Sequence, residues 1–278
     1  MKVAVFGAGT MGSGIAQVFA AHGHTTLMYA SSVASAQRHK DKLDASLQKR
    51  VEKGKMTQEA KDALMANIFV EEKSAAADAD LVIECAKEEM AYKRAMLSEL
   101  DGLCKESAIF ATNTSSLSVT EMGLGLKHPV IGMHFFNPVP AMKLVEIICG
   151  LATSEETEKT VTELATVLGK TPVKVEEAPG FVVNRILIPM INEAVGILAD
   201  GVATAEGIDQ AMQLGANHPM GPLALGDLVG LDVCLAIMET LYREFGDTKY
   251  RPHPLLRKMV RAGKLGRKTG VGFFDYSK

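Results

Sequence analysis

The sequence lacks the excess of basic residues that marks many nucleic-acid-binding proteins. Its 30 lysines and arginines are balanced by 33 aspartates and glutamates, which gives a formal net charge of -3. Proteins that bind nucleic acid usually carry a strongly basic face. We therefore expect no nucleic-acid partner and look for a small-molecule ligand instead.

Cysteine is scarce and is not spaced as a metal or disulfide framework. The chain has 4 cysteines, which lie far apart, with no C-x-x-C pair and no histidine cluster at zinc spacing. We interpret them as buried thiols in a reducing compartment and expect no metal site. No signal peptide precedes the first predicted strand, so we expect a cytoplasmic protein. The four are Cys85, Cys104, Cys149 and Cys234.

Long uninterrupted apolar runs are also lacking. The most apolar stretch, 181–198, contains two asparagines, an arginine, a proline and a glutamate, which a membrane span would not readily tolerate. We therefore expect no membrane association. The composition is 47% apolar and 23% charged over 278 residues, which suits a globular chain of one large domain or two modest ones.

The most informative stretch lies near the N-terminus. Val3–Phe6 has the composition of a buried parallel strand, and glycines follow it at G-x-G-x-x-G spacing. Such glycines permit a tight turn, close approach of the backbone to a pyrophosphate, and packing of the next helix, whose first N–H groups face the phosphates. The alternative is a glycine-rich loop without a ligand. We predict a dinucleotide site at Gly7, Gly9, Thr10, Met11 and Gly12.

Strand and helix patterns alternate after this motif. The alternation predicts an α/β fold whose N-terminal domain is a Rossmann-type, doubly wound, mostly parallel sheet. We expect further strands at 25–29, 68–70, 79–84, 107–111, 130–135, 144–148 and 173–175, and helices at 33–55, 58–66, 88–100 and 157–168.

The composition shifts to helix formers beyond Pro179. We place a dinucleotide-binding domain at 1–179 and an all-α substrate and dimerisation domain at 180–278. Its apolar helices are expected to meet a second copy of the chain, giving a homodimer or higher homo-oligomer. Helices are predicted at 181–199, 204–214 with Thr204 as N-cap, 222–244 and 254–262.

Four residues form a candidate catalytic set. Glu146 lies in the apolar run Leu144–Ile148, where a buried carboxylate needs a partner, and His134 would serve. The carboxylate would then fix one imidazole nitrogen and leave the other to exchange a proton with substrate. Ser115 and Asn184 can each hydrogen-bond an oxygen that alternates between carbonyl and hydroxyl. The alternative roles are a structural histidine and ordinary turn and helix-cap residues.

Longer segments around these residues resemble one family. They are 6–16, 113–117, 132–138 and 178–185, with 215–222 and 266–273 near the C-terminus. Together they are similar, in the same order, to 3-hydroxyacyl-CoA dehydrogenases, and closest to the bacterial short-chain type. The resemblance implies nicotinamide-dependent, reversible conversion of 3-hydroxybutyryl-CoA to acetoacetyl-CoA.

The resemblance adds residues that spacing alone does not indicate. It implies the four candidate roles above, with His134 as the acid-base. It further implies cofactor contacts from Glu88, Lys93, Asn137 and Lys268, although Lys93 also has the spacing of an i, i+4 pair with Glu89. It implies that Lys49, Lys53 and Lys55 hold the acyl-CoA nucleotide, whose phosphates need cations. For these lysines a solvated helix face is the alternative.

One departure from the family concerns the cofactor. An acidic residue that holds the adenosine ribose is expected at the end of the second strand, where this chain has Ala30. We expect NAD, with NADP possible because Ala30 neither binds the ribose hydroxyls nor repels a 2′-phosphate.

The sequence leaves two functions open as alternatives to a 3-hydroxyacyl-CoA dehydrogenase. A hydroxyacid dehydrogenase acting on a substrate without CoA would be expected to have a lysine where Asn184 stands. A non-catalytic cofactor-binding protein would be expected to lose the histidine and glutamate pair, and both residues are present.

Overall fold

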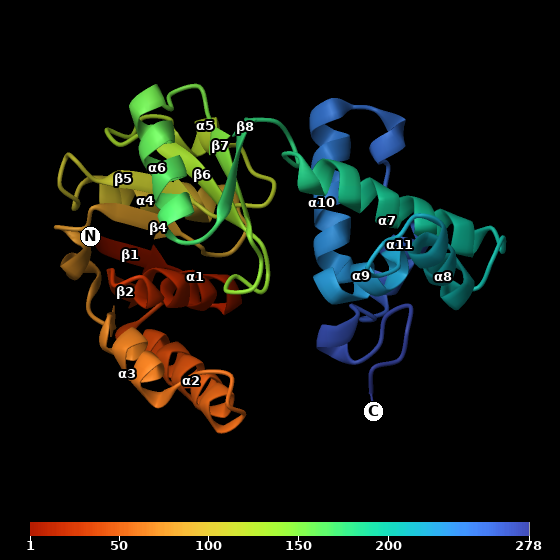
Figure 1. Cartoon of the computed structure of the whole chain (residues 1–278). Helices are drawn as coiled ribbons and strands as arrows, with labels where there is room; N and C mark the ends of the chain where they lie inside the picture. The colour runs from red at the N-terminus through yellow and green to blue at the C-terminus, as the bar shows by residue number, and fades with distance from the viewer. Residues whose placement is uncertain (278) are drawn as a thin grey trace. The chain divides into compact units, whose positions relative to one another are not determined.

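The computed structural model describes residues 1–277. The contacts between them divide the chain into two compact units, the first Met1–Glu177 and the second beginning at Ala178. Figure 1 shows that the first unit contains the sheet and that the second is helical. Within residues 1–277, no helix is both long and apolar enough to cross a membrane.

The first unit is built on a single sheet. In the described residues it has eight strands in the order β3-β2-β1-β4-β5-β6-β7-β8, and all neighbouring pairs are parallel except β6 and β7. This confirms the predicted doubly wound, mostly parallel fold. The strands are β1 (Lys2–Phe6), β2 (Thr25–Tyr29), β3 (Ile68–Phe69), β4 (Leu81–Glu84), β5 (Ile109–Thr112), β6 (Val130–Phe135), β7 (Leu144–Cys149) and β8 (Thr171–Glu176).

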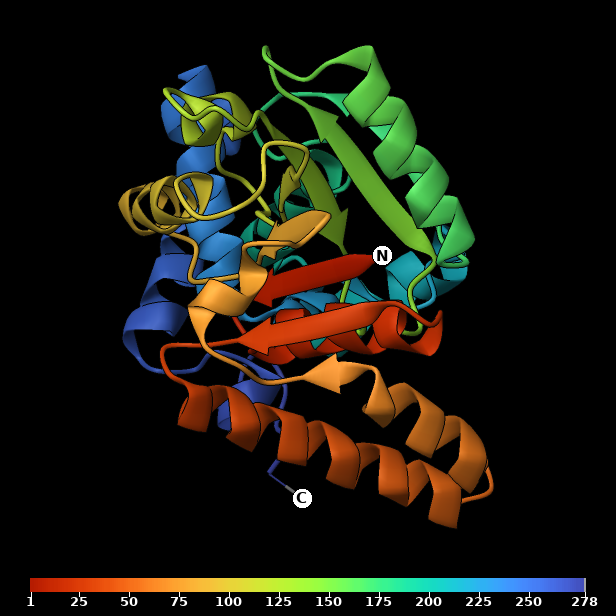
Figure 2. The ribbon, with the colours of Figure 1, turned by 90° about the vertical axis from the view of Figure 1, so that its left-hand side faces the viewer.

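Helices cover the sheet and extend beyond its edge. Figure 2 shows α2 and α3 lying side by side next to β3, and α6 lying along β7 and β8. The helices of this unit are α1 (Thr10–Ala21), α2 (Val33–Glu52), α3 (Gln58–Ala66), the 3-10 turn η1 (Lys73–Ala76), α4 (Met90–Asp101), α5 (Val119–Gly123) and α6 (Glu155–Val167). The short helix α5 was not expected from the sequence.

The period-2 alternation of β1 divides its side chains between two sides of the sheet. Val3 and Val5 belong to a core cluster that includes Ile15 and Phe19 of α1. That packing holds α1 against one face of the sheet. The first residue of α1 lies just beyond the carboxyl end of β1. The N-terminus of α1 is thereby held at the edge where parallel sheets bind ligands.

The second unit consists of packed helices around its own core, which includes Ile191 and Leu241. Thr204 caps α8 as expected, since its side chain accepts from the Gly207 N–H. The expected helix 222–244 is wrong, because the chain breaks into α9 and α10 at Gly230, whose φ of 104° is incompatible with a continuous helix. The elements are α7 (Val183–Ala199), α8 (Ala205–Gly215), α9 (Pro222–Val229), α10 (Leu231–Phe245), η2 (Thr248–Tyr250), α11 (Pro254–Arg261) and η3 (Arg267–Thr269).

The cysteines do not all match their expected burial. All four are free thiols, but only Cys234 is fully buried, and Cys85, Cys104 and Cys149 are partly exposed. The prediction of four buried thiols is therefore wrong for three of them. The three lie at or beyond the ends of strands and helices, where a small side chain is only partly covered.

Candidate active site

The glycine loop after β1 has the geometry that a dinucleotide requires. Gly7 has a φ of 111°, and a Cβ there would lie 2.5 Å from the backbone of Cys85. A Cβ on Gly12 would lie 1.8 Å from the Gly7 carbonyl oxygen, so larger residues would push α1 away from β1. A Cβ on Gly9, by contrast, would meet nothing within 4 Å, which leaves its backbone open to an approaching phosphate. The residues present therefore fit a bound dinucleotide.

The start of α1 completes this cradle. Thr10 and Met11 are its first residues, and Gly9 is the N-cap residue, with no side-chain hydrogen bond at the cap. The N–H groups of a first helical turn have no partner within the helix and carry the positive end of its dipole. An anion such as a pyrophosphate is the ligand that such a terminus favours.

Ala30 lies immediately after β2, which ends at Tyr29 as expected. It is partly buried against the core of the first unit. The adjacent β1 ends at Phe6, directly level with Tyr29. The structure thus places Ala30 at the same sheet edge as the glycine loop, with no carboxylate of its own.

His134 and Glu146 form a buried pair. They stand directly opposite each other in antiparallel β6 and β7, and Nδ1 of His134 lies 2.7 Å from Oε2 of Glu146. The residues are 4% and 1% exposed. A carboxylate at Nδ1 fixes the orientation of the ring and leaves Nε2 as the nitrogen that can exchange a proton. The structure brings together the two residues that the sequence led us to pair.

The turn that carries Ser115 is held by Glu88. One oxygen of that carboxylate, Oε1, accepts hydrogen bonds from the backbone N–H of Ser115 at 2.8 Å and of Ser116 at 3.2 Å, and from the Thr114 hydroxyl. In addition, the side-chain oxygen of Asn113 accepts from the Phe135 N–H at 2.8 Å. The Asn113 bond fixes the turn relative to the strand end where His134 lies, and the Glu88 bonds fix it relative to the segment between β4 and α4.

A buried lysine supports Glu88. Lys93 is 1% exposed, and its Nζ lies 2.7 Å from Glu84 Oε2 and 3.1 Å from Glu88 Oε2. Glu84 also accepts from the Thr112 hydroxyl at 2.6 Å. Burial raises the pKa of the Glu84 carboxyl despite the nearby ammonium group. Burial alone would lower the pKa of Lys93, but the two carboxylates outweigh it and raise that pKa, so the lysine stays protonated.

The alternative considered for Lys93, an i, i+4 pair with Glu89, is not the pair that the structure shows. Glu89 forms its ion pair with Lys87, at 2.6 Å, while Lys93 turns inward to Glu84 and Glu88. An i, i+4 pair requires both residues to lie within the helix. Glu89 is the N-cap residue of α4, so it lies just outside the helix and its side chain does not share a helix face with Lys93.

Other predicted binding residues of the first unit are exposed. Asn137 is exposed just beyond β6. Lys49 lies in the last turn of α2, and Lys53 and Lys55 follow in the turn after it. All three lysines are exposed, and within residues 1–277 no ion pair to an acidic residue is formed by them. Their charges therefore face solvent.

Asn184 and Lys268 lie in the second unit. Asn184 is the second residue of α7 and is 9% exposed. Lys268 lies in η3, and its Nζ donates to Asp232 Oδ2 at 2.6 Å. Their predicted roles toward substrate and cofactor stay predictions.

Two residues of this site were missed by the sequence reasoning. Glu84 ends a strand whose apolar composition predicts burial, and a buried carboxylate needs a partner, which is the signal that identified Glu146. Asn113 lies in a polar run after β5, where nothing local distinguishes it from its neighbours.

Comparisons with known proteins agree over the whole chain. Residues 2–178 match the NAD-binding domain of 3-hydroxyacyl-CoA dehydrogenases, and residues 180–276 match their C-terminal domain. A 3-hydroxybutyryl-CoA dehydrogenase of Clostridioides difficile is 58% identical, covering 100% of both chains. A probable 3-hydroxybutyryl-CoA dehydrogenase of Bacillus subtilis is 51% identical, covering 100% of this chain and 98% of the relative.

A solved structure is also similar. The (S)-3-hydroxybutyryl-CoA dehydrogenase of Ralstonia eutropha superposes with a TM-score of 0.94 at 48% sequence identity. The match covers 100% of this chain and 99% of that one. The likeness therefore extends through both units.

Proposed function

The chain belongs to the 3-hydroxyacyl-CoA dehydrogenase family of oxidoreductases, and we propose that it interconverts 3-hydroxybutyryl-CoA and acetoacetyl-CoA. The first unit matches the family's NAD-binding domain, so the cofactor is a nicotinamide dinucleotide. Within this proposal the cofactor is NAD and the location is the cytoplasm. The names of the relatives support the four-carbon substrate.

The observation that carries the proposal is the buried contact between His134 Nδ1 and Glu146 Oε2. When bound, the nicotinamide ring accepts the hydride from the substrate or returns it. During oxidation, His134 takes the hydroxyl proton at Nε2, and during reduction it returns a proton to the carbonyl oxygen. Glu146 stabilises the imidazolium that forms and holds the ring in place.

Ser115 and Asn184 act on the same substrate oxygen in this proposal. Each donates a hydrogen bond that strengthens as negative charge develops on that oxygen. Ser115 depends on Glu88, which holds its turn, and Glu88 depends on Lys93. Glu88, Lys93, Asn137 and Lys268 are proposed to hold or line the cofactor site, together with the glycine loop.

The exposed lysines Lys49, Lys53 and Lys55 are proposed to bind the phosphates of CoA. Their unpaired exposure supports this role, because a cation without an acidic neighbour can bind an incoming phosphate without breaking an existing pair. The contact is far from the reacting atoms and contributes to substrate binding alone.

A homodimer through the second unit is a further part of the proposal. That unit exposes large apolar side chains, including Ile186 at 69% and Leu214 at 79%. Exposed apolar surface of this kind marks many interaction sites. Light scattering coupled to gel filtration would report a mass of at least twice the chain mass of 29.8 kDa.

The deciding assay follows reduced cofactor with acetoacetyl-CoA, with acetoacetate as the matched substrate that lacks CoA. We expect rapid consumption with acetoacetyl-CoA only. Consumption with free acetoacetate at a similar kcat/KM would favour a hydroxyacid dehydrogenase that does not use CoA. No consumption with either, despite cofactor binding, would favour a non-catalytic protein.

A further inference from the structure

Lys170 is a buried lysine that the proposed chemistry does not use. It is 8% exposed. Burial lowers the pKa of its ammonium group, and no acidic neighbour among residues 1–277 opposes that effect. A buried charge is costly unless it is hydrogen-bonded. The groups that bind this ammonium group must therefore stay close to it.

Two backbone carbonyls of a single loop accept hydrogen bonds from this lysine. The loop consists of residues 136–143 between β6 and β7, the β6–β7 loop. Nζ of Lys170 donates to the Val139 carbonyl at 2.5 Å and to the Met142 carbonyl at 2.8 Å. Lys170 itself immediately precedes β8. Its ammonium group thus joins the β6–β7 loop to the start of that strand at two points.

The end of α6 determines where Lys170 lies. Gly169 has a φ of 69°, which a residue with a side chain rarely adopts. The Gly169 N–H donates to the Thr166 carbonyl at 2.9 Å, and the Lys170 N–H donates to the Ala165 carbonyl at 3.0 Å. This pair of bonds is the Schellman motif, which ends a helix and reverses the chain. The sequence Gly169-Lys170 therefore directs the chain from α6 into β8 with the lysine at the turn.

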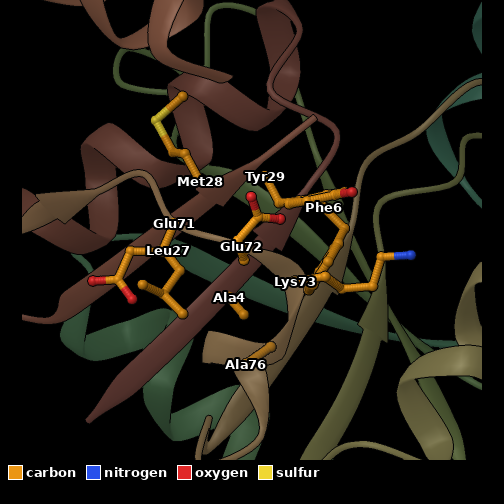
Figure 3. A pocket seen from close by; sticks show the side chains of 9 residues that line it. All are labelled: Ala4, Phe6, Leu27, Met28, Tyr29, Glu71, Glu72, Lys73 and Ala76. Atoms are coloured by element: carbon orange, nitrogen blue, oxygen red, sulfur yellow. The ribbon is translucent and has the colours of Figure 1, made fainter. Parts of the chain in front are cut away.

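The β6–β7 loop also packs against α1. A Cβ on Gly14 of that helix would lie 2.9 Å from the Val139 Cβ, so glycine alone permits this close approach. Val139 is 2% exposed and belongs to the core cluster that contains Val5 of β1. On the other face of β1, Phe6 lines a small hollow with Tyr29 (Figure 3). The loop therefore lies on the face of the sheet that α1 covers.

This contact brings Asn137 close to the dinucleotide cradle. Asn137 is exposed and precedes Val139 by two positions, which span at most about 7 Å. Gly14, which Val139 contacts, follows Gly12 of the glycine motif by two positions in α1. Any displacement of Val139 from α1 would therefore move Asn137 relative to the cradle.

We propose that Lys170 is a positioning residue for the dinucleotide site, which holds the β6–β7 loop against α1 and thereby fixes Asn137 at the cradle. The inference rests on the proposed function only for the role of Asn137 as a cofactor contact. Lys170 is buried and acts through the loop. A hydrocarbon side chain of similar length would fill the same space, but it would not hold the two carbonyls.

The test measures the Kd for NADH by titrating cofactor fluorescence, without acyl-CoA. For Lys170→Met we expect the Kd to rise about tenfold, equivalent to about 1.4 kcal/mol, because the loop loses both hydrogen bonds. The matched control is Lys61→Met. Lys61 is 7% exposed, and its Nζ donates to Gln48 Oε1 at 2.9 Å, between α3 and α2. This control should lose stability in urea but change the Kd less than about twofold.

Two further variants check that the loop and Asn137 transmit the effect. In an Asn137→Ala background, Lys170→Met should change the Kd less than about twofold, because substitutions that act on one contact are not additive. Gly14→Ala leaves Lys170 in place but pushes Val139 away from α1, and it should also raise the Kd. Gly14→Ala keeps the inference testable if Lys170→Met does not fold.

An unchanged Kd in folded Lys170→Met or in Gly14→Ala would overturn the inference. An equal rise in Lys61→Met, or an undiminished effect of Lys170→Met in the Asn137→Ala background, would overturn it as well. Wild type that binds NADH and shows the expected effects, but does not turn over acetoacetyl-CoA, would refute the proposed function and leave this inference standing. Wild type that binds neither NADH nor NADPH would overturn both.

Discussion

The side-chain oxygen of Asn113 accepts a hydrogen bond from the Phe135 N–H at 2.8 Å, which joins the Ser115 turn to the residue after His134. Both partners are buried. The bond therefore fixes the turn of Ser115, which follows β5, relative to β6, which carries His134. A substitution of Asn113 is therefore expected to shift the Ser115 turn relative to His134 without removing either side chain.

Asn113→Ala should lower both stability and kcat. A buried N–H without an acceptor costs about 1–3 kcal/mol, which urea unfolding would measure. The matched control is Asn192→Ala, since Asn192 Oδ1 likewise accepts from a backbone N–H, that of His253, at 2.8 Å. The control should lose stability but keep kcat. Equal kcat in both variants would show that the Asn113 bond only stabilises the fold.

Lys93→Met should destabilise the protein strongly. It leaves the carboxylates of Glu84 and Glu88 without their ammonium partner, and breaking a buried pair in this way costs about 3–5 kcal/mol. Because those carboxylates raise the pKa of Lys93, the stabilisation is present below the ordinary lysine pKa of about 10.4 and is lost as pH rises through the higher folded value.

The control for Lys93 is Lys87→Met, which breaks the exposed pair with Glu89. Exposed ion pairs contribute little to the free energy of unfolding, so the urea concentration at the unfolding midpoint should stay almost the same. If Lys93→Met unfolds at the same urea concentration as this control, the buried network is not a source of stability.

Changing Lys49, Lys53 and Lys55 together to Ala should raise KM for acetoacetyl-CoA more than it lowers kcat. Binding of a remote nucleotide contributes equally to the ground state and the transition state. Steady-state kinetics at low salt would measure the effect. A control that removes the exposed charges of Lys42, Lys127 and Lys159 should leave KM nearly unchanged, and an equal rise in both triple variants would indicate a general charge effect.

Cys234 should resist alkylation in the folded protein. It is 0% exposed, and burial raises the pKa of its thiol to about 12, so the reactive thiolate is almost absent near pH 8. Iodoacetamide labelling followed by peptide mass spectrometry should modify Cys104 and Cys149 first. Cys234 should react only after denaturation, and labelling of the native protein at the rate of the other two would contradict its burial.

The sequence predicted most strands because their apolar runs are bounded by glycine and polar residues. β2 and β6 have the predicted limits, 25–29 and 130–135. The break at Gly230 was missed because apolar residues recur on both sides, and a single glycine is tolerated within many helices. Only the observed φ of 104° distinguishes the two cases.

The site was partly predictable for a similar reason. A carboxylate within an apolar strand signals a partner, which led to the pairing of Glu146 with His134. The hydrogen bonds that the Ser115 turn donates to Glu88 join residues far apart in the chain, and no local sequence pattern indicates such contacts.

The most direct test of the account is acetoacetyl-CoA-dependent oxidation of NADH by wild type and His134→Ala, with NADH binding measured on both. General acid-base catalysis contributes about a hundred- to ten-thousand-fold, so kcat should fall on that scale while the Kd for NADH is retained. Glu146→Gln should also slow turnover and change its pH profile. If kcat of His134→Ala falls less than about tenfold, well short of such effects, His134 is not the acid-base and the account is wrong.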